Sequence, residues 1–168
     1  MTYEELKYRI CRECGARCCK RFDYKNWFVT LSLRDIVRIS EGLGKDLEYV
    51  LNNYIEIIRI GSSIILTLKV INRVCIFLRE DRCTIQKFKP IACRVYPVYI
   101  PGMYIDPQCP LSKYPELLKD EEMYVYQYVK EHLETQKILE EYSPKSIRDI
   151  AWIIRETLKD LDKNIETS

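Results

Sequence analysis

Four of the eight cysteines in this 168-residue chain fall within nine consecutive residues, at positions 11, 14, 18 and 19. The other four follow one at a time along the middle of the chain. A Cys-x2-Cys pair places two sulfurs on one turn, where both reach the same metal ion or the same edge of a cluster. Hydrophobic packing has no need for so dense a run of thiols. The sequence therefore predicts a metal centre with the ligands Cys11, Cys14, Cys18, Cys19, Cys75, Cys83, Cys93 and Cys109.

Length and composition predict a small globular protein, with 47% hydrophobic and 31% charged residues. The longest apolar stretch, residues 63–71, is too short to span a bilayer, and acids near the N-terminus stand where a signal peptide needs basic residues. These features predict a cytoplasmic protein without a membrane partner. In a reducing cytosol, metal ligation is favoured over disulfides or free thiols, which stay open as alternatives.

The charge is divided unevenly along the chain. Residues 1–115 contain 19 Lys and Arg against 12 Asp and Glu, whereas residues 116–168 contain 8 against 13. The basic part is also the cysteine-rich part. Because a site of four thiolates is anionic, nearby cations lower its electrostatic cost, and this explains most of the pattern. A basic surface for nucleic acid or an acidic protein is the alternative.

The predicted fold is α+β, with a metal-stapled cysteine-rich domain of short strands and helices over residues 1–115 and a helical hairpin over residues 116–168. Capping boxes at Thr2 and Ser32 predict one helix that leads to Cys11 and another over 33–41 that Gly42 ends. The pattern also predicts a strand over 27–31, a helix over 45–53 and a β-hairpin over 54–60 and 63–71. Residues 72–115 are predicted to be an irregular proline-rich loop in which only 98–105 is strand or extended chain.

The last two predicted helices, 116–142 and 145–161, pack against each other in antiparallel fashion in this interpretation. The first presents one apolar side to the rest of the protein, with Met123, Val125, Val129 and Leu133 among its residues. The second begins after Ser143-Pro144 and buries an isoleucine-rich face.

The cysteine pattern resembles that of a known family. The segments that carry the resemblance are Cys11-x2-Cys14-Gly-x2-Cys18-Cys19, Leu31-x3-Asp35-Ile36-x-Arg38-Ile39, Pro90-x2-Cys93-Arg94-x-Tyr96-Pro97 and Cys109-Pro110. Together they resemble the YkgJ-type cysteine-cluster family, a zinc- or iron-chelating domain related to flagellin lysine-N-methylase. The resemblance spans about residues 9–110 and implies a metal-binding role for all eight cysteines. Two departures are the three residues before Cys18, where the family has two, and Lys89 in place of the family's usual arginine.

The sequence leaves the metal and the function open. Three close thiols with a distant fourth favour an iron–sulfur cluster of the 4Fe-4S type, and zinc is the alternative. One centre and two centres are equally compatible with eight thiols. The first functional hypothesis is a redox module or a support for a methyl-transfer partner protein. The others are a structural zinc module whose basic face binds protein or nucleic acid, and a lysine methyltransferase. No catalytic residue is identified, so enzymatic activity stays undecided.

Overall fold

The computed structural model describes residues 2–20, 28–100 and 104–163 and confirms the α+β class. Its first half contains α1 (Tyr3–Glu13), η1 (Arg17–Cys19), α2 (Leu33–Leu43), α3 (Leu47–Tyr54), β1 (Ile55–Ile60) and β2 (Ser63–Leu68). Its second half contains β3 (Val70–Ile71), β4 (Val74–Cys75), β5 (Leu78–Arg79), β6 (Arg82–Cys83), η2 (Gln86–Phe88), α4 (Ile91–Val95), β7 (Val98–Ile100), β8 (Tyr104–Ile105), η3 (Pro110–Lys113), η4 (Pro115–Leu118), α5 (Lys119–Tyr142) and α6 (Ile147–Lys163).

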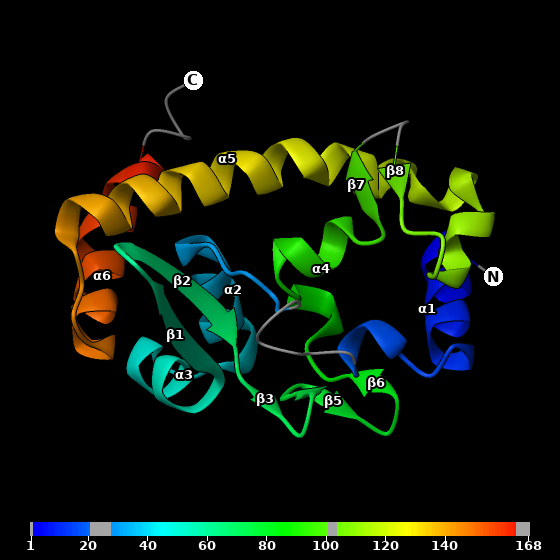
Figure 1. The fold of residues 1–168 in the computed structure, drawn as a ribbon, viewed down its shortest axis with the longest axis horizontal. Helices are drawn as coiled ribbons and strands as arrows, with labels where there is room; N and C mark the ends of the chain where they lie inside the picture. The colour runs from blue at the N-terminus through cyan, green and yellow to red at the C-terminus, as the bar shows by residue number, and fades with distance from the viewer. Residues whose placement is uncertain (1, 21–27, 101–103, 164–168) are drawn as a thin grey trace.

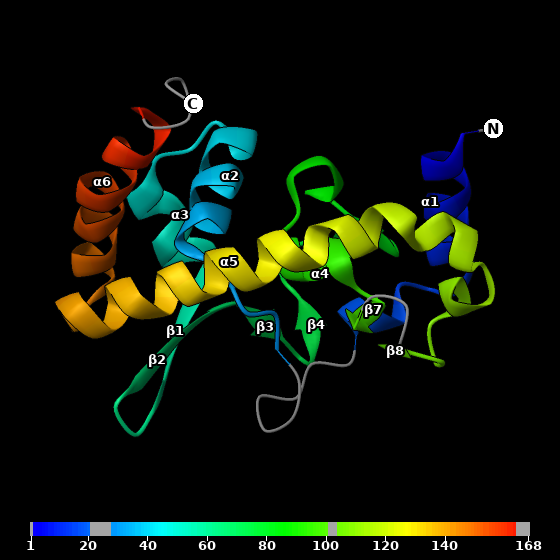
Figure 2. The same ribbon diagram turned by 90° about the horizontal axis from the view of Figure 1, so that it is seen from above.

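The elements form two sides that α5 joins. Figures 1 and 2 show α2, α3, α6 and the β1–β2 hairpin on one side, which we call the hairpin side. The other, the cysteine side, contains α1, η1, β5, β6, α4, β7 and β8. Helix α5 runs across both, contacting α2 and β2 at one end and α4 and β7 at the other. The predicted boundary between residues 1–115 and 116–168 stays a prediction.

Two groups of buried side chains hold these parts together. The larger lies mainly on the hairpin side, where Ile36, Ile39 and Leu51 are fully buried, and it extends to Cys75. The smaller consists of Val98, Leu111, Leu117 and Leu118 and lies on the cysteine side. Most of the buried apolar side chains therefore belong to the larger group, which also contacts Cys19 and Cys83. In the described part of the chain no helix is long and apolar enough to cross a membrane.

Both predicted capping boxes are present. Thr2 and Glu5 cap α1, and Ser32 accepts from the Asp35 N–H at 3.0 Å to cap α2. Gly42, however, lies inside α2. The helix ends at Gly44, which has the left-handed conformation typical of a helix C-terminus (φ 60°). The strand predicted over 27–31 starts outside the described residues, and its described part forms a single bridge from Thr30 to Thr67 of β2.

Replacing Gly42 by alanine is expected to destabilise the protein. A Cβ at this position would overlap the ring of Phe88 in η2. Overpacking costs about 1–3 kcal/mol, against a gain of about 1 kcal/mol in helix propensity. The predicted net loss of about 1 kcal/mol lowers the Tm by about 2–4 °C, measurable by thermal denaturation.

The same substitution in a Phe88→Leu background provides the control for this Gly42→Ala prediction. With the ring gone, Gly42→Ala should cost less than it does in the unchanged protein, because the overlapping atoms are absent. An equal cost in both backgrounds would contradict the proposed clash.

The region predicted as irregular loop contains regular elements. Besides β7 and β8, which lie in the stretch 98–105 predicted as strand, residues 72–115 include β4, the β5–β6 hairpin and helix α4. The turns of the first two hairpins, β3–β4 and β5–β6, use the pairs Asn72-Arg73 and Glu80-Asp81, all with positive φ. Two-residue hairpin turns need such left-handed residues, but their usual Asn-Gly or Asp-Gly signature is missing here. The prediction of a loop was wrong for this reason.

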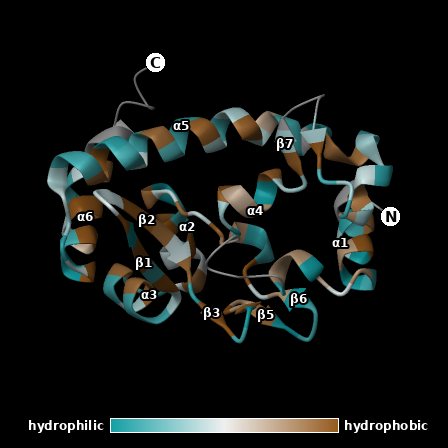
Figure 3. Ribbon diagram, viewed as in Figure 1, coloured by the Kyte–Doolittle hydropathy of each residue, from teal (hydrophilic) through white to brown (hydrophobic). Residues whose placement is uncertain are grey.

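Both predicted C-terminal helices exist, but they do not pack against each other in antiparallel fashion. Helix α6 turns away from α5 and packs against α2 and α3. The predicted apolar side of α5 is also wrong, since Met123 is 76% exposed and Leu133 is 67% exposed. Its buried positions include Glu131 and Thr135, and Figure 3 shows hydrophilic and hydrophobic segments alternating along the helix.

Candidate metal centre

One cavity of about 420 Å³ brings together all the predicted ligands. It lies on the cysteine side and is lined by thiols from six elements or their ends: Cys11, Cys14, Cys18, Cys19, Cys75, Cys83, Cys93 and Cys109. All eight thiols are free of disulfides. Folding therefore brings the later four cysteines to the cavity that the N-terminal run lines.

The N-terminal cysteines reach the cavity through a reversal of the chain after α1. Cys11 lies in the last turn of α1, and Cys14 is its C-cap. Gly15 (φ 69°) and Ala16 (φ 49°) then adopt the left-handed conformation, and the Ala16 N–H donates to the Cys11 carbonyl at 3.0 Å. Alanine is uncommon in this conformation. The reversal sends the chain into η1, which carries Cys18.

The four later cysteines are each fixed by a different element. Cys75 ends β4 and Cys83 ends β6, so both lie at the ends of short hairpins. Cys93 lies within α4, and Cys109 is the N-cap of η3, immediately before Pro110. None of these positions could be placed from spacing alone, because each depends on a short element that the sequence pattern does not reveal.

Burial controls the protonation of most thiols. It raises the pKa of Cys11 to about 12 and those of Cys75 and Cys109 to about 11, and it also raises the pKa of Cys83 and Cys93. Metal binding at these thiols must therefore release protons, so the affinity should fall as the pH falls.

The vicinal pair behaves differently. The Cys18 and Cys19 sulfurs lie 3.9 Å apart, and a hydrogen bond between them lowers the pKa of Cys18 to about 7 while raising that of Cys19. Lys89 contributes to the same effect on Cys18, since its positive charge favours the thiolate. The pKa of Cys18 is thus lowered, whereas those of Cys11, Cys19, Cys75, Cys83, Cys93 and Cys109 are raised.

The carboxylates that line the cavity already have cationic partners. Glu121 accepts from Lys7 Nζ at 3.0 Å, and Asp81 is paired with Lys20. The single histidine, His132, is not among the residues described as lining it. Thiols therefore remain as the available donors, a set that fits zinc or an iron–sulfur cluster. Among the described residues, no three Cys, His, Asp or Glu side chains are already grouped as a metal site.

Comparison with known proteins agrees with this donor set. The sequence profile of the CxxCxxCC family, described as "Putative zinc- or iron-chelating domain", matches residues 10–122. This match covers more than half of the chain and includes every cysteine. The chain belongs to the CxxCxxCC family. No curated protein and no solved structure matches it.

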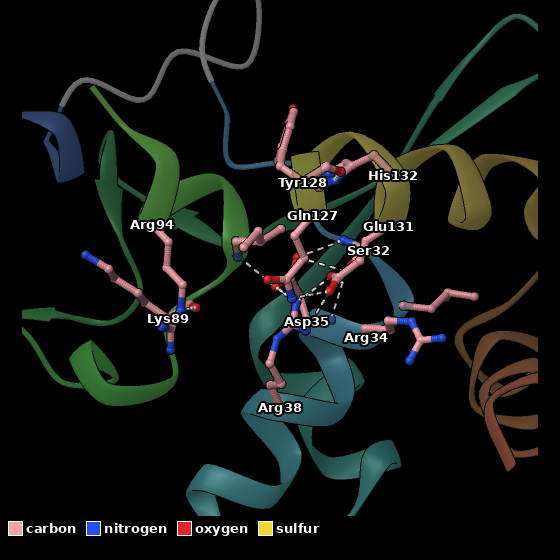
Figure 4. A network of polar contacts seen from close by, with 12 residues as sticks. Ser32, Arg34, Asp35, Arg38, Lys89, Arg94, Gln127, Tyr128, Glu131 and His132 are labelled. Atoms are coloured by element: carbon pink, nitrogen blue, oxygen red, sulfur yellow. Dashed lines mark hydrogen bonds and ion pairs between the residues drawn. The ribbon is translucent and has the colours of Figure 1, made fainter. Parts of the chain in front are cut away.

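Sequence reasoning missed a buried polar network that supports the cysteines of this CxxCxxCC protein (Figure 4). Asp35 has no exposed surface, and besides capping α2 it accepts from the Ile91 N–H at 2.8 Å. Ile91 is the first residue of α4, the helix that contains Cys93. Asp35 therefore connects the N-termini of two helices. The available signal was the capping box, which predicted only its bond to Ser32.

The network continues from α2 to α5. Arg38 donates to Asp35 at 2.7 Å and to both carboxylate oxygens of Glu131, at 2.9 and 2.6 Å. Ser32 and Gln127 also donate to Glu131, at 2.9 and 2.7 Å. Figure 4 shows these side chains converging between the two helices. The polar buried face of α5 is thus explained by partners on α2.

Acid is expected to destabilise the protein through Glu131. Burial opposes the charge of this carboxylate, but hydrogen bonds from Arg38, Gln127 and Ser32 outweigh it and lower its pKa below the usual 4.5. A lowered folded pKa contributes stability that is complete above pH 4.5 and is lost as the pH falls through the folded value. Urea denaturation of the metal-free protein at several pH values measures this loss.

The variant Glu131→Gln is the control, because it keeps the shape of the side chain without its titration. Its stability should be lower at neutral pH and should change less below pH 4.5 than that of the unchanged chain. An equal acid dependence in both proteins would show that other carboxylates account for it.

Proposed function

We propose that this CxxCxxCC protein is an iron–sulfur protein whose cysteines hold clusters of the 4Fe-4S type. The observation that supports this proposal is the single cavity lined by all eight thiols. Its volume of about 420 Å³ is far larger than the share of one water molecule, about 30 Å³, and leaves room for multi-atom clusters between the sulfurs. When bound, such clusters supply one-electron chemistry.

The charges around the cavity are suited to an anionic group. The positive charge of Lys89 favours the thiolate form of four thiols, Cys11, Cys18, Cys83 and Cys93. It partly offsets the rise in pKa that burial causes. Arg12, Arg17 and Arg82 line the cavity as well. Positive charge at the wall of the cavity stabilises thiolate ligands and the net negative charge of a thiolate-bound cluster.

Elemental analysis of protein purified without oxygen, together with its visible absorption spectrum, tests the proposal. Iron with acid-labile sulfide and broad charge-transfer absorption is the expected result. A colourless protein with one or two zinc ions would contradict the cluster and make the thiols a structural zinc site. A protein free of both metals would contradict metal binding itself.

A further inference from the structure

We propose that the ion pair between Lys7 and Glu121 positions helix α1 for metal binding. Lys7 lies in α1 and Glu121 in the first turn of α5, and both side chains line the cavity. The pair holds in place the helix that contains Cys11 and that has Cys14 as its C-cap. This role rests on the proposed metal-binding function, and neither Lys7 nor Glu121 is itself a proposed ligand.

The contact between the two side chains is close and largely shielded from water. Lys7 Nζ donates to both carboxylate oxygens of Glu121, at 3.0 and 3.2 Å. The side chains of Lys7 and Glu121 are only 9% and 14% exposed. Because burying an unpaired charge is costly, burial favours the arrangement of α1 and α5 in which these two charges meet. Glu121 also lies near the N-terminus of α5, where the helix dipole favours a negative charge.

Lys7 lies on the same face of α1 as the cysteines. Cys11 follows Lys7 by four residues and Cys14 follows Cys11 by three, a spacing that places all three on one side of a helix. All three line the cavity. Each residue turns an α-helix by about 100°, so a rotation of α1 by that amount would turn Cys11 away from the cavity.

The apolar contacts of α1 are shallow. Leu6, Ile10 and Cys11 pack against the smaller buried group, but each of them is only partly buried. Among the residues of α1 whose exposure the structure describes, Lys7 alone is buried. Apolar contacts have no preferred direction, whereas an ion pair with two hydrogen bonds does. The ion pair therefore sets the orientation of α1.

The face of α5 that contains Glu121 continues along the cavity. Val125 follows Glu121 by four residues and Tyr128 follows Val125 by three, and all three line the cavity. Val125 packs against the smaller buried group, as Cys11 does. Figures 1 and 2 both show α1 near the N-terminal end of α5. The ion pair thus joins two walls of the cavity at this end of α5.

Substitution of Lys7 tests this role through the affinity for Zn²⁺, measured by competition with a chromophoric chelator. We expect Lys7→Met to weaken binding by about 10–100-fold, the range typical for the loss of a group that orients a metal ligand. Lys7→Arg keeps the charge and can donate to both carboxylate oxygens, so it should retain most of the affinity. Arg9→Met is the matched control, because Arg9 is paired with Glu13 on the exposed face of the same helix. Equal affinities of Lys7→Met and Arg9→Met would overturn the proposal.

A double variant separates positioning from the cost of an unpaired charge. Lys7→Met alone leaves the Glu121 carboxylate without this ammonium partner, so α1 should detach and the Tm should fall. Lys7→Met/Glu121→Met replaces both charges by apolar side chains, and its Tm should return close to that of the wild type. Its Zn²⁺ affinity should stay low, because the directional contact is absent. A double variant with both the stability and the affinity of the wild type would overturn the positioning role.

The metal-free protein provides a second readout. N-ethylmaleimide should modify Cys11 about tenfold faster in Lys7→Met than in the wild type, because a detached helix of this length unfolds readily. Lys7→Arg and Arg9→Met should react at the wild-type rate, as measured by mass spectrometry of the labelled peptides. An unchanged rate in Lys7→Met would show that the ion pair does not hold α1.

The results distinguish a failure of this role from a failure of the proposed function. Wild-type protein that binds neither zinc nor iron would refute metal binding, whatever the labelling of Cys11 shows. Zinc without iron in the wild type, bound more weakly by Lys7→Met, would refute the iron–sulfur cluster and support the positioning role. Wild-type affinity for Zn²⁺ in Lys7→Met would refute the positioning role and leave metal binding intact.

Discussion

The variant Asp35→Asn should lower the stability of the protein by about 2–4 kcal/mol. Removing one member of a buried ion pair costs about 3–5 kcal/mol, and Arg38 keeps Glu131 as a second partner, which reduces the loss. Asparagine retains one oxygen for the bond from the Ile91 N–H but no charge for Arg38. For a chain of this size the loss corresponds to about 5–15 °C in Tm, measurable by thermal denaturation.

Asp46→Asn is the matched control for this change. Asp46 is exposed and caps α3 through a 2.7 Å bond from the Tyr49 N–H, a role that asparagine performs equally well. The control should therefore change the Tm little. Because Asp35 holds the helix of Cys93, Asp35→Asn should also reduce metal content, whereas Asp46→Asn should not. Equal melting temperatures of the two variants would contradict the role given to the buried network.

Removing the metal should let the cysteine side unfold locally and should leave the hairpin side folded. Free metal at a thousandfold above its Kd contributes about 4 kcal/mol to the structure that binds it, so its loss should speed amide exchange there by about a thousandfold. We expect this effect in η1, β4, β6, α4 and η3, which carry most of the thiols. The strands β1 and β2 should keep their protection, because they pair with each other from Ile55 to Leu68 and bury Ile55, Ile64 and Leu66 in the larger group.

Hydrogen exchange with mass spectrometry, on loaded protein and on protein treated with chelator and reductant, measures this difference. Chelator treatment of a Cys14→Ser/Cys83→Ser variant is the control, since a chain without two of the candidate ligands should bind less metal and respond less. A uniform loss of protection over β1, β2 and α4 would contradict the prediction. It would mean that the two sides unfold as one cooperative unit.

Capping residues in the sequence predicted where α1 and α2 begin, because a helix start depends on residues only a few positions apart. The capping boxes of α1 and α2 were correct because a side chain three residues away satisfies the backbone N–H. The face of α6 was correct as well, since Ile150, Ile153 and Ile154 are all buried. For α5 the length was predictable but the face was not. Thr135 is buried because it accepts from the Leu33 N–H, a partner 102 residues away.

The sequence by itself determined the kind of chemistry, because eight cysteines, four of them in one short run, provide thiol ligands and little else. The sequence also determined the family, because the spacing of those cysteines is the family's signature. Only the tertiary structure decided that all eight line one cavity. The reason is physical: Cys75, Cys83, Cys93 and Cys109 take their positions from short hairpins, a short helix and a cap, which are stable only when packed against the rest of the protein.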